Sequence, residues 1–180
     1  DFPPDSKILK AAKDAISMGQ TNYVDPIGIA PLREGIASQI NMRYHINIAA
    51  EQVLITHGAR FAIYLAIATN ISPGGSVLFF EPAYPAYRQI VESFESRPIA
   101  ISTRLENAWT PDVDTVEDLF DDQPDIMILN SPSNPTGKSL SDDIFNQLIK
   151  IAAEKGVIII SDEVYKDYTF KKCKSILEYN

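Results

Sequence analysis

The chain has 180 residues, 45% of them hydrophobic and 22% charged, an ordinary globular composition that excludes disordered, collagen-like and low-complexity architectures. The formal net charge is −8, and the stretch from Glu106 to Asp125 holds eight acids and no Lys or Arg. Nucleic acids and anionic membranes bind to positively charged surfaces, so neither is an expected partner.

A single cysteine, Cys173, excludes a disulfide framework and fits a reducing compartment. With only two histidines, His45 and His57, a histidine-based metal site is not expected. No apolar run approaches the roughly 20 residues that span a bilayer, and no basic segment followed by an apolar one opens the chain. We therefore expect a soluble cytoplasmic protein without a bound metal.

Helices and strands alternate along most of the chain. Apolar residues recur at helical spacing from Ser6 to Gly19, and a second helix begins at Pro31. After it, short apolar and β-branched runs alternate with helical segments. The predicted strands are 53–56, 77–80, 98–101, 126–129 and 157–160, and the remaining predicted helices are 31–45, 61–71, 84–94, 114–120 and 141–154.

The strands indicate the fold class. Four of them are apolar on both faces, which is typical of a parallel sheet that helices cover on both sides. The sequence therefore predicts an α/β protein, a three-layer helix–sheet–helix sandwich with a mostly parallel sheet. In open sheets of this kind, ligands bind at the carboxyl ends of the strands.

Polar and aromatic residues follow four of the predicted strands. Gly58 precedes a helix whose first backbone N–H groups can bind an anion. Tyr84 offers a flat face to a heteroaromatic ring. Asn134 follows a third strand, and Asp162 and Tyr165 follow the last one. We expect these residues to lie near one another at the carboxyl edge of the sheet.

Each of these residues also has a purely structural explanation. Gly58 can serve a tight turn, Tyr84 can pack after its proline, and Asp162 can cap the turn that follows it. A carboxylate that ends an apolar strand is costly to bury without a cation or a hydrogen-bond donor, however. Asp162 is therefore also a candidate ligand-binding residue.

Taken together, the motifs resemble a known family. In chain order they are Tyr23, Gly28, Leu32-Arg33, the Gly58 turn, Pro82-Ala83-Tyr84, Asn134-Pro135-Thr136-Gly137 and Ser161-Asp162-Glu163-Val164-Tyr165. Their order and rough spacing resemble those of fold-type I pyridoxal-phosphate aminotransferases, in the class I/II group that includes the aspartate and aromatic aminotransferases. The resemblance covers nearly the whole chain.

The resemblance implies how the phosphate of pyridoxal 5′-phosphate is bound. The backbone N–H groups of Ala59 and Arg60, at the Gly58 turn, would hold the phosphate. Tyr23 would reach the phosphate of a neighbouring subunit, which implies a homodimer with shared active sites. The family often has a second glycine or a small polar residue where this chain has Ala59 and Arg60.

The resemblance also implies how the ring of the cofactor is held. Tyr84 would stack on the pyridine ring, and Asp162 would pair with the ring nitrogen and keep it protonated, so that the ring withdraws electrons. Asn134 and Tyr165 would form hydrogen bonds with the phenolic oxygen O3′. Cis peptide bonds are implied before Pro82 and Pro135.

A catalytic residue is not expected in these 180 residues. The family's Schiff-base lysine follows the Asp-x-x-Tyr motif after a further strand, in a Ser-x-Ser/Ala-Lys context that the sequence up to Asn180 does not contain. The lysines that follow Asp162 lie too close to it and lack this context: Lys166, Lys171, Lys172 and Lys174. We therefore expect the chain to be the N-terminal and central portion of a longer protein.

The implied organisation is an N-terminal helix and dimer-facing segment at 1–30, followed by a pyridoxal-phosphate-binding large domain at 31–180, incomplete before the lysine. The implied function is transfer of an amino group between an amino acid and a 2-oxo acid, with the isolated chain inactive. A pyridoxal-phosphate-dependent lyase of the same fold shares every motif. A non-catalytic sensor that binds the cofactor is a third alternative, and it requires a basic DNA-binding segment that these residues do not supply.

Overall fold

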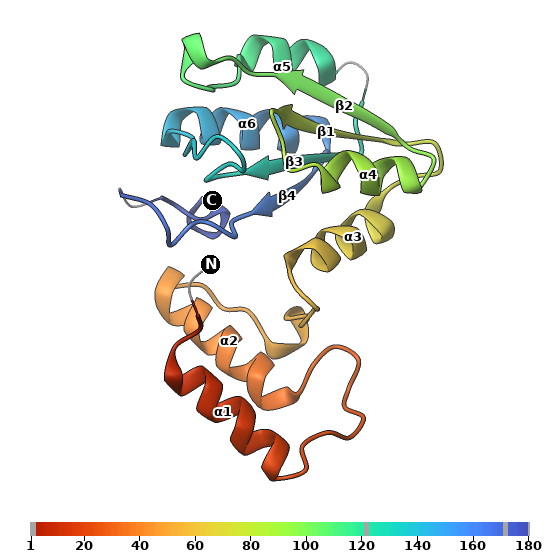
Figure 1. Ribbon diagram of the computed structural model, residues 1–180. Coiled ribbons are helices and arrows are strands. Elements are labelled where there is room, and N and C mark those ends of the chain that lie inside the picture. Colours follow the sequence, from red (N-terminus) through yellow and green to blue (C-terminus); the bar gives the residue numbers. More distant parts are fainter. Residues whose placement is uncertain (1–2, 121–122, 171–172, 180) are drawn as a thin grey trace. The chain divides into compact units, whose positions relative to one another are not determined.

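The computed structural model describes residues 3–120, 123–170 and 173–179, which fall into two compact units, Asp1–Ile55 and Thr56–Asn180 (Figure 1). The boundary predicted at residue 30 rests on a role in dimerisation rather than on compactness, and it stays a prediction. Lys171 and Lys172 lie outside the described residues.

The first unit contains helices α1, Ser6–Ser17, and α2, Ala30–Tyr44, and the short 3-10 helix Ala50–Gln52. Both α-helices were predicted, and Asp5 caps α1 by accepting a hydrogen bond from the backbone N–H of Lys7. No residue of α1 is buried, so its apolar face is exposed within this chain.

Buried Arg33 organises the loops of the first unit. Its Nε donates to the carbonyl oxygen of Gly28 at 3.0 Å, and its Nη1 donates to that of Ala50 at 3.1 Å. Gly28 has φ +102°, and a Cβ at this position would lie 2.4 Å from Cγ1 of Ile55. Only glycine fits this close approach without displacing Ile55.

The strand predicted at 53–56 is wrong. This segment forms no strand, and the four-stranded sheet is built from other residues. Ile55 donates a single backbone hydrogen bond to Ile27, at 3.0 Å, and Leu54 is 49% exposed. An apolar, β-branched run indicates that a segment suits a partly buried surface. It does not indicate whether a neighbouring strand is available for pairing.

The second unit is built on a sheet in the order β2-β1-β3-β4, with every neighbouring pair parallel. Its strands are β1, Ser76–Glu81, β2, Arg97–Ser102, β3, Ile126–Asn130, and β4, Ile158–Asp162. The other four predicted strands are therefore confirmed. In the β3–β4 register Asn130 lies opposite Asp162, so two polar side chains are side by side where both strands end.

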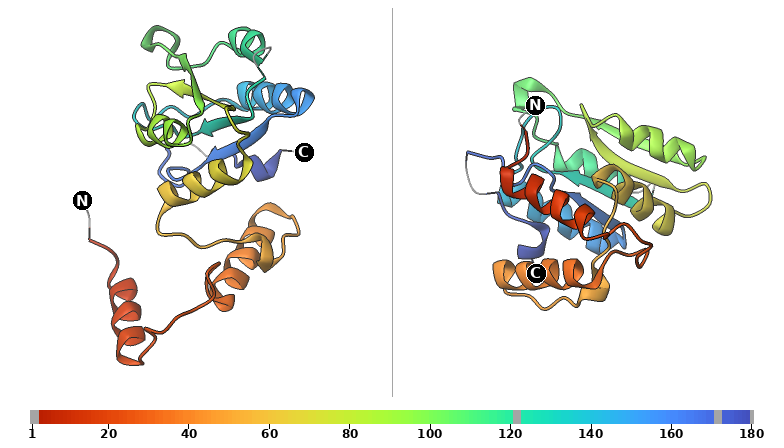
Figure 2. Two further views of the ribbon diagram at one scale, coloured as in Figure 1. Left: turned by 90° about the vertical axis from the view of Figure 1, so that its right-hand side faces the viewer. Right: turned by 60° about the horizontal axis from the view of Figure 1, so that its bottom comes forward.

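Helices cover both faces of this sheet, as predicted for a three-layer sandwich. On one face α3, Ala59–Asn70, and α4, Ala86–Ser93, pack on Val77, Phe79, Ile126 and Ile128. On the other face α5, Val113–Leu119, and α6, Asp142–Lys155, pack on Leu78, Met127 and Leu129. Alternate residues of β1 and β3 thus enter opposite cores, because successive side chains of a strand point to opposite faces. Figure 2 shows the strands between the two pairs of helices.

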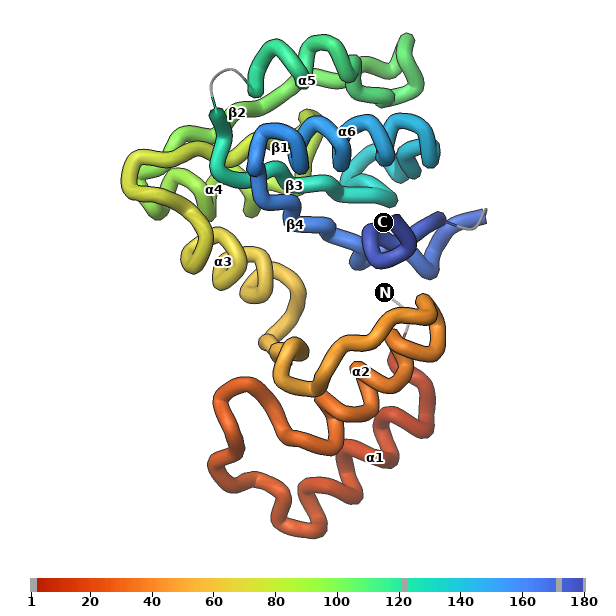
Figure 3. Tube along the Cα trace, turned by 180° about the vertical axis from the view of Figure 1, so that it is seen from behind, coloured from red at the N-terminus to blue at the C-terminus, as the bar shows by residue number. Residues whose placement is uncertain are grey.

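The C-terminal segment 173–179 contains the 3-10 helix Ile176–Glu178, and it contacts Glu163, directly after β4, through Ser175 and Ile176. Figures 1 and 3 show the segment from opposite sides. Ile176 and Tyr179 pack against the core that α5 and α6 cover. None of the helices in the described part of the chain has the length and apolar character that a bilayer crossing requires.

Candidate functional site

Six of the predicted site residues line one cavity of about 170 Å³. Ala59, Tyr84, Asn134 and Asp162 are among the residues that line it, which confirms the prediction that they lie near one another. Gly58 directly precedes this group, while Tyr23 belongs to the first unit and is fully exposed. The cavity is lined by Ala59, Arg60, Tyr84, Asn134, Asp162 and Tyr165 from the prediction, and by Ile63, Tyr87, Asn130 and Val164.

The N-terminus of α3 supplies unpaired backbone donors to the cavity. Gly58 is the N-cap residue, with φ +85°, and it offers no side chain to cap the helix. Its carbonyl oxygen accepts from the N–H groups of Phe61 and Ala62 at 3.2 and 3.4 Å. In the part of the chain that the structure describes, the N–H groups of Ala59 and Arg60 have no hydrogen-bond partner. They add to the positive end of the helix dipole and can receive an anion.

The side chain of Arg60 is held at the wall of the cavity by α4. Its Nη2 donates to Oε1 of Gln89 at 3.3 Å, which leaves most of the five guanidinium N–H donors unused by this contact. A residue with a permanent positive charge therefore lines the cavity at the start of α3.

Asp162 is held by two donors at the end of β4. Its Oδ2 accepts from the hydroxyl of Tyr87 at 2.6 Å, and its Oδ1 accepts from the backbone N–H of Val164 at 3.2 Å. Burial, followed by the hydrogen bond and the charge of Asp162, raises the pKa of Tyr87, so this hydroxyl stays protonated and keeps donating. The bond to Val164 is the structural role predicted as an alternative, and it occupies only one of the two carboxylate oxygens.

Asn130 connects the end of β4 to the turn that carries Asn134. Its Nδ2 donates to the carbonyl oxygen of Asp162 at 3.0 Å, and its Oδ1 accepts from the backbone N–H of Asn134 at 2.7 Å. The cis peptide bonds expected before Pro82 and Pro135 are present, and a third precedes Pro132.

Three further side chains offer groups to a ligand in this cavity. Tyr84 meets Tyr87 edge to face, with ring centroids 5.7 Å apart and planes at 87°. The side-chain amide of Asn134 and the hydroxyl of Tyr165 have no hydrogen-bond partner among the described residues. One aromatic ring and two neutral donors are thus available next to the Asp162 carboxylate.

Sequence reasoning missed two residues that shape the site, Tyr87 and Asn130. A signal existed for Asn130, because it is the first polar residue after an apolar strand. Tyr87 gave none, since the residue that it contacts lies 75 positions along the chain.

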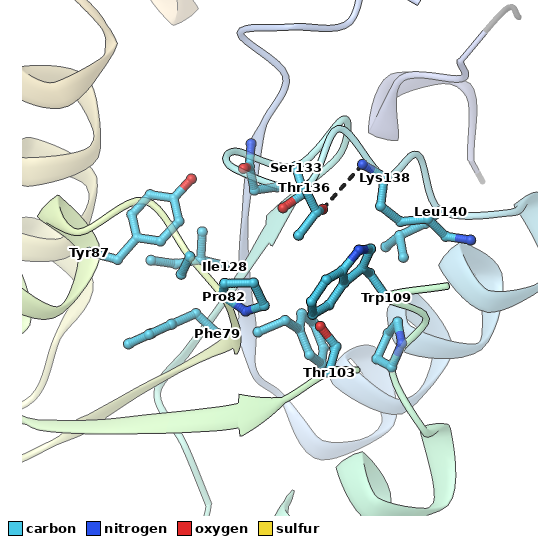
Figure 4. Close-up of a pocket in the computed structure, with 14 residues that line it drawn as sticks. Phe79, Pro82, Tyr87, Thr103, Trp109, Ile128, Ser133, Thr136, Lys138 and Leu140 are labelled. Carbon is cyan, nitrogen blue, oxygen red and sulfur yellow. Dashed lines mark hydrogen bonds between the residues drawn. The ribbon is translucent and has the colours of Figure 1, made fainter. Parts of the chain in front are cut away.

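Tyr87 and Asn130 also line a second, smaller cavity of about 30 Å³ (Figure 4). Figure 4 shows Trp109, Thr103 and Pro82 gathered on one side of it, with Tyr87 apart from them. Thr136 Oγ1 accepts from the backbone N–H of Lys138 at 3.2 Å here. A space of this size holds about one or two water molecules.

Metal ligands do not cluster in the described residues: no group of three or more His, Cys, Asp or Glu side chains could hold a metal ion. The donor set of the larger cavity is instead one carboxylate, one guanidinium, free N–H groups, hydroxyls and an aromatic ring. Such a set fits an aromatic ligand with an anionic group at one end and a protonated nitrogen at the other.

Comparison with known proteins identifies the family. The family model described as aminotransferase class I and II matches residues 1–178. Aspartate aminotransferase of Sulfolobus acidocaldarius is 35% identical over 99% of this chain, and human tyrosine aminotransferase is 33% identical over 97% of it. The chain spans 45% and 38% of the length of these two relatives.

Solved structures show the same fold. Aspartate aminotransferase from Thermotoga maritima matches with a TM-score of 0.93 and 31% identity, over 100% of this chain and 48% of that one. Aromatic aminotransferase from Pyrococcus horikoshii matches with a TM-score of 0.94 and 28% identity, over 100% of this chain and 49% of that one. The chain belongs to the class I and II aminotransferase family.

Proposed function

We propose that this chain provides the pyridoxal-phosphate site of an aminotransferase, which moves an amino group between an amino acid and a 2-oxo acid. The family depends on this cofactor, which supplies an electron-withdrawing ring for reactions at the substrate's α-carbon. One observation carries the proposal: the Asp162 carboxylate, held by Tyr87, shares a cavity with the free N–H groups that begin α3.

Asp162 holds the proton on the ring nitrogen of the cofactor. A carboxylate within about 4–6 Å of a titratable nitrogen favours its protonated form. The Tyr87 hydroxyl at 2.6 Å stabilises the carboxylate anion and fixes its orientation. Because β4 ends here, the carboxylate projects from a rigid strand rather than from a free loop.

The other residues of the cavity hold the remaining parts of the cofactor. The N–H groups of Ala59 and Arg60, after the Gly58 turn, bind the phosphate at the positive end of α3. Tyr84 stacks on the ring. The free amide of Asn134 and the free hydroxyl of Tyr165 form hydrogen bonds with O3′.

In this proposal, residues that do not line the cavity complete the cofactor site. The cavity of about 170 Å³ is smaller than the roughly 300–1,000 Å³ of most ligand sites. Residues 1–30 form the dimer-facing segment in this proposal, and fully exposed Tyr23 binds the phosphate of the neighbouring subunit in a homodimer. A large domain at 31–180 and a cytoplasmic location, which the single cysteine favours, belong to the same proposal.

The amino acid that serves as substrate is left open by the relatives. Their names include aspartate, tyrosine and arginine–pyruvate transaminases, at 32–35% identity to this chain. The proposal is therefore limited to amino acids and 2-oxo acids as classes.

Titration with pyridoxal phosphate tests the proposal. We expect the chain to bind it, and Asp162→Ala to weaken binding by about tenfold or more, as expected for loss of a charge-assisted hydrogen bond worth about 1.5–3 kcal/mol. Asp143→Ala is the matched control, because Asp143 is an exposed acid on α6, and it should bind like the wild type. Binding can be followed by the absorbance of the cofactor. An equal loss of affinity for pyridoxal phosphate in Asp162→Ala and Asp143→Ala, or no binding by the wild type, would contradict the proposal.

A further inference from the structure

We propose that Glu163 is a positioning residue for Asp162. Its carboxylate ties the turn that carries Asp162 and Tyr165 to the segment 173–179, so that docking of this segment and orientation of Asp162 depend on each other. The consequence for ligand binding rests on the proposed function of the cavity, whereas the tie itself is a property of this chain.

One oxygen of Glu163 gathers three donors from two parts of the chain. Oε1 accepts from the backbone N–H of Ile176 at 2.7 Å, from Oγ of Ser161 at 3.0 Å and from Oγ of Ser175 at 3.1 Å. Ser161 belongs to β4, and the other two belong to the C-terminal segment. Hydrogen bonds to an ionised acceptor are about twice as strong as neutral ones, so this oxygen strongly links β4 to the C-terminal segment.

The other oxygen of Glu163 faces a buried cation. Nζ of Lys166 lies 3.6 Å from Oε2 of Glu163 and 3.8 Å from Oε1 of Glu178, and its side chain is 7% exposed. The same oxygen of Glu178 accepts from the backbone N–H of Ser175 at 2.9 Å. Loss of Glu163 removes one of the two carboxylates that lie within 4 Å of Nζ of Lys166, and Glu178 remains as the other.

Asp162 lies in the chain between Ser161 and Glu163, which are joined by a side-chain hydrogen bond. On one side Ser161 donates to Glu163, and on the other the backbone N–H of Lys166 donates to the carbonyl oxygen of Glu163 at 3.0 Å. The carbonyl oxygen of Asp162 itself accepts from Nδ2 of Asn130. Backbone movement at Glu163 therefore changes the direction of the Asp162 side chain.

No residue of the segment 173–179 lines the 170 Å³ cavity. The segment reaches the strand ends through Glu163 and through a weak contact of 3.8 Å between Sγ of Cys173 and Oγ of Ser131. A further anchor is Glu178, which faces Lys166 at 3.8 Å. Two more lead to α6: Lys174 pairs with Asp142 at 2.7 Å, and Tyr179 stacks on Phe145 with centroids 4.9 Å apart. Of the residues that contact the segment, Glu163 is the one next to Asp162 in the chain.

Hydrogen exchange on the ligand-free chain tests the tie. The backbone N–H of Val164 donates to Oδ1 of Asp162, so its exchange rate reports how firmly that carboxylate is oriented. We expect Ser175→Ala, which removes one donor from the far segment, to speed this exchange about threefold or more, and Glu163→Ala to speed it further. Leu105→Ala, at an exposed position, should leave it unchanged. An unchanged rate in Ser175→Ala would overturn the proposal, even where Glu163→Ala fails to fold.

The second measurement uses pyridoxal phosphate labelled with ¹⁵N in its ring, whose chemical shift reports protonation of the ring nitrogen. We expect the bound ring to lose its proton at a pH lower by about one unit in Glu163→Ala than in the wild type, because Asp162 is then poorly aimed. Leu148→Ala, which weakens the core without touching Glu163, should titrate like the wild type. Equal titration in Glu163→Ala would overturn the proposal. Failure of the wild type to bind the cofactor would contradict the proposed function instead. The hydrogen-exchange experiment would still test whether Glu163 links the segment 173–179 to Asp162.

Discussion

At the scale of single residues, Asp162 serves the fold and the site at once. Its Oδ1 caps the following turn at Val164, and its Oδ2 receives the Tyr87 hydroxyl at 2.6 Å beside the cavity. A carboxylate in this position is tolerated because both oxygens have a donor. The hydrogen bond from Tyr87 is the shorter and therefore the stronger of the two, and it orients the carboxylate for binding a cation.

Replacement of Tyr87 by Phe tests this arrangement through its pH dependence. Burial and Asp162 raise the pKa of Tyr87 above its ordinary value, so its contribution to stability is present below about pH 10 and is lost as the pH rises further. We expect Tyr87→Phe to lower the free energy of unfolding by about 1.5–3 kcal/mol at pH 7 and by less at pH 11.

Urea unfolding at pH 7, 9 and 11 measures this difference. Tyr168→Phe is the control, because Tyr168 is 84% exposed, and its curve should follow that of the wild type at each pH. A loss in Tyr87→Phe that stays constant from pH 7 to pH 11 would show that the hydroxyl is not an obligatory donor.

Residue types and their positions after strands were enough to predict which residues meet at the cavity. Tyr84, Asn134 and Asp162 all follow an apolar strand, and parallel strands bring their carboxyl ends to one edge. Tyr87 escaped prediction as a site residue because its role depends on a partner 75 positions away, whereas the position of Asn130 directly after an apolar strand was a signal that was not used. Such pairings are set by packing, which a single sequence does not show.

At the scale of elements, the apolar sequence pattern predicted which segments are buried better than it predicted which segments pair in the sheet. The strands at β1, β2, β3 and β4 were expected, and each is paired in the sheet. The run 53–56 has a similar composition but lies at the junction of the two units, where no strand neighbours it. Its apolar side chains meet the first unit through Ile55, whose N–H bonds to Ile27.

Helix α6 offers a direct test of the core. Leu148 is completely buried under the face of the sheet that carries Leu78 and Met127. We expect Leu148→Ala to lower the free energy of unfolding by about 2–5 kcal/mol, since it removes buried methyl groups and leaves a cavity. Leu105→Ala, at a position 67% exposed, should change it by less than about 0.5 kcal/mol. Urea unfolding at pH 7 gives both values, and similar losses in the two variants would contradict the packing described.

At the scale of the whole molecule, the chain carries the cavity but spans only 45% of the length of the first aspartate aminotransferase relative. Helix α1 leaves its apolar face exposed, since Ile8 and Ile16 are 62% and 68% exposed. Exposed apolar side chains of this kind favour self-association of the isolated chain.

Covalent attachment of the cofactor is the property that these 180 residues should lack. None of the lysines that the structure describes lines the 170 Å³ cavity. Lys166 is buried against Glu163 and Glu178, and Lys174 is paired with Asp142 at 2.7 Å, which raises the pKa of Lys174. An amine attacks an aldehyde only in its neutral form, and the carboxylate of Asp142 stabilises the charged form of Lys174, so this lysine is not activated.

We therefore expect the chain to bind pyridoxal phosphate without forming a bond to a lysine. Incubation with the cofactor, reduction with borohydride and peptide mass spectrometry should give only low, scattered labelling of the ten lysines, equal to that of the urea-unfolded chain. The same preparation should transfer no amino group from aspartate or tyrosine to a 2-oxo acid. Stoichiometric labelling of one lysine in the folded chain, absent after unfolding, would show that these residues contain a working nucleophile.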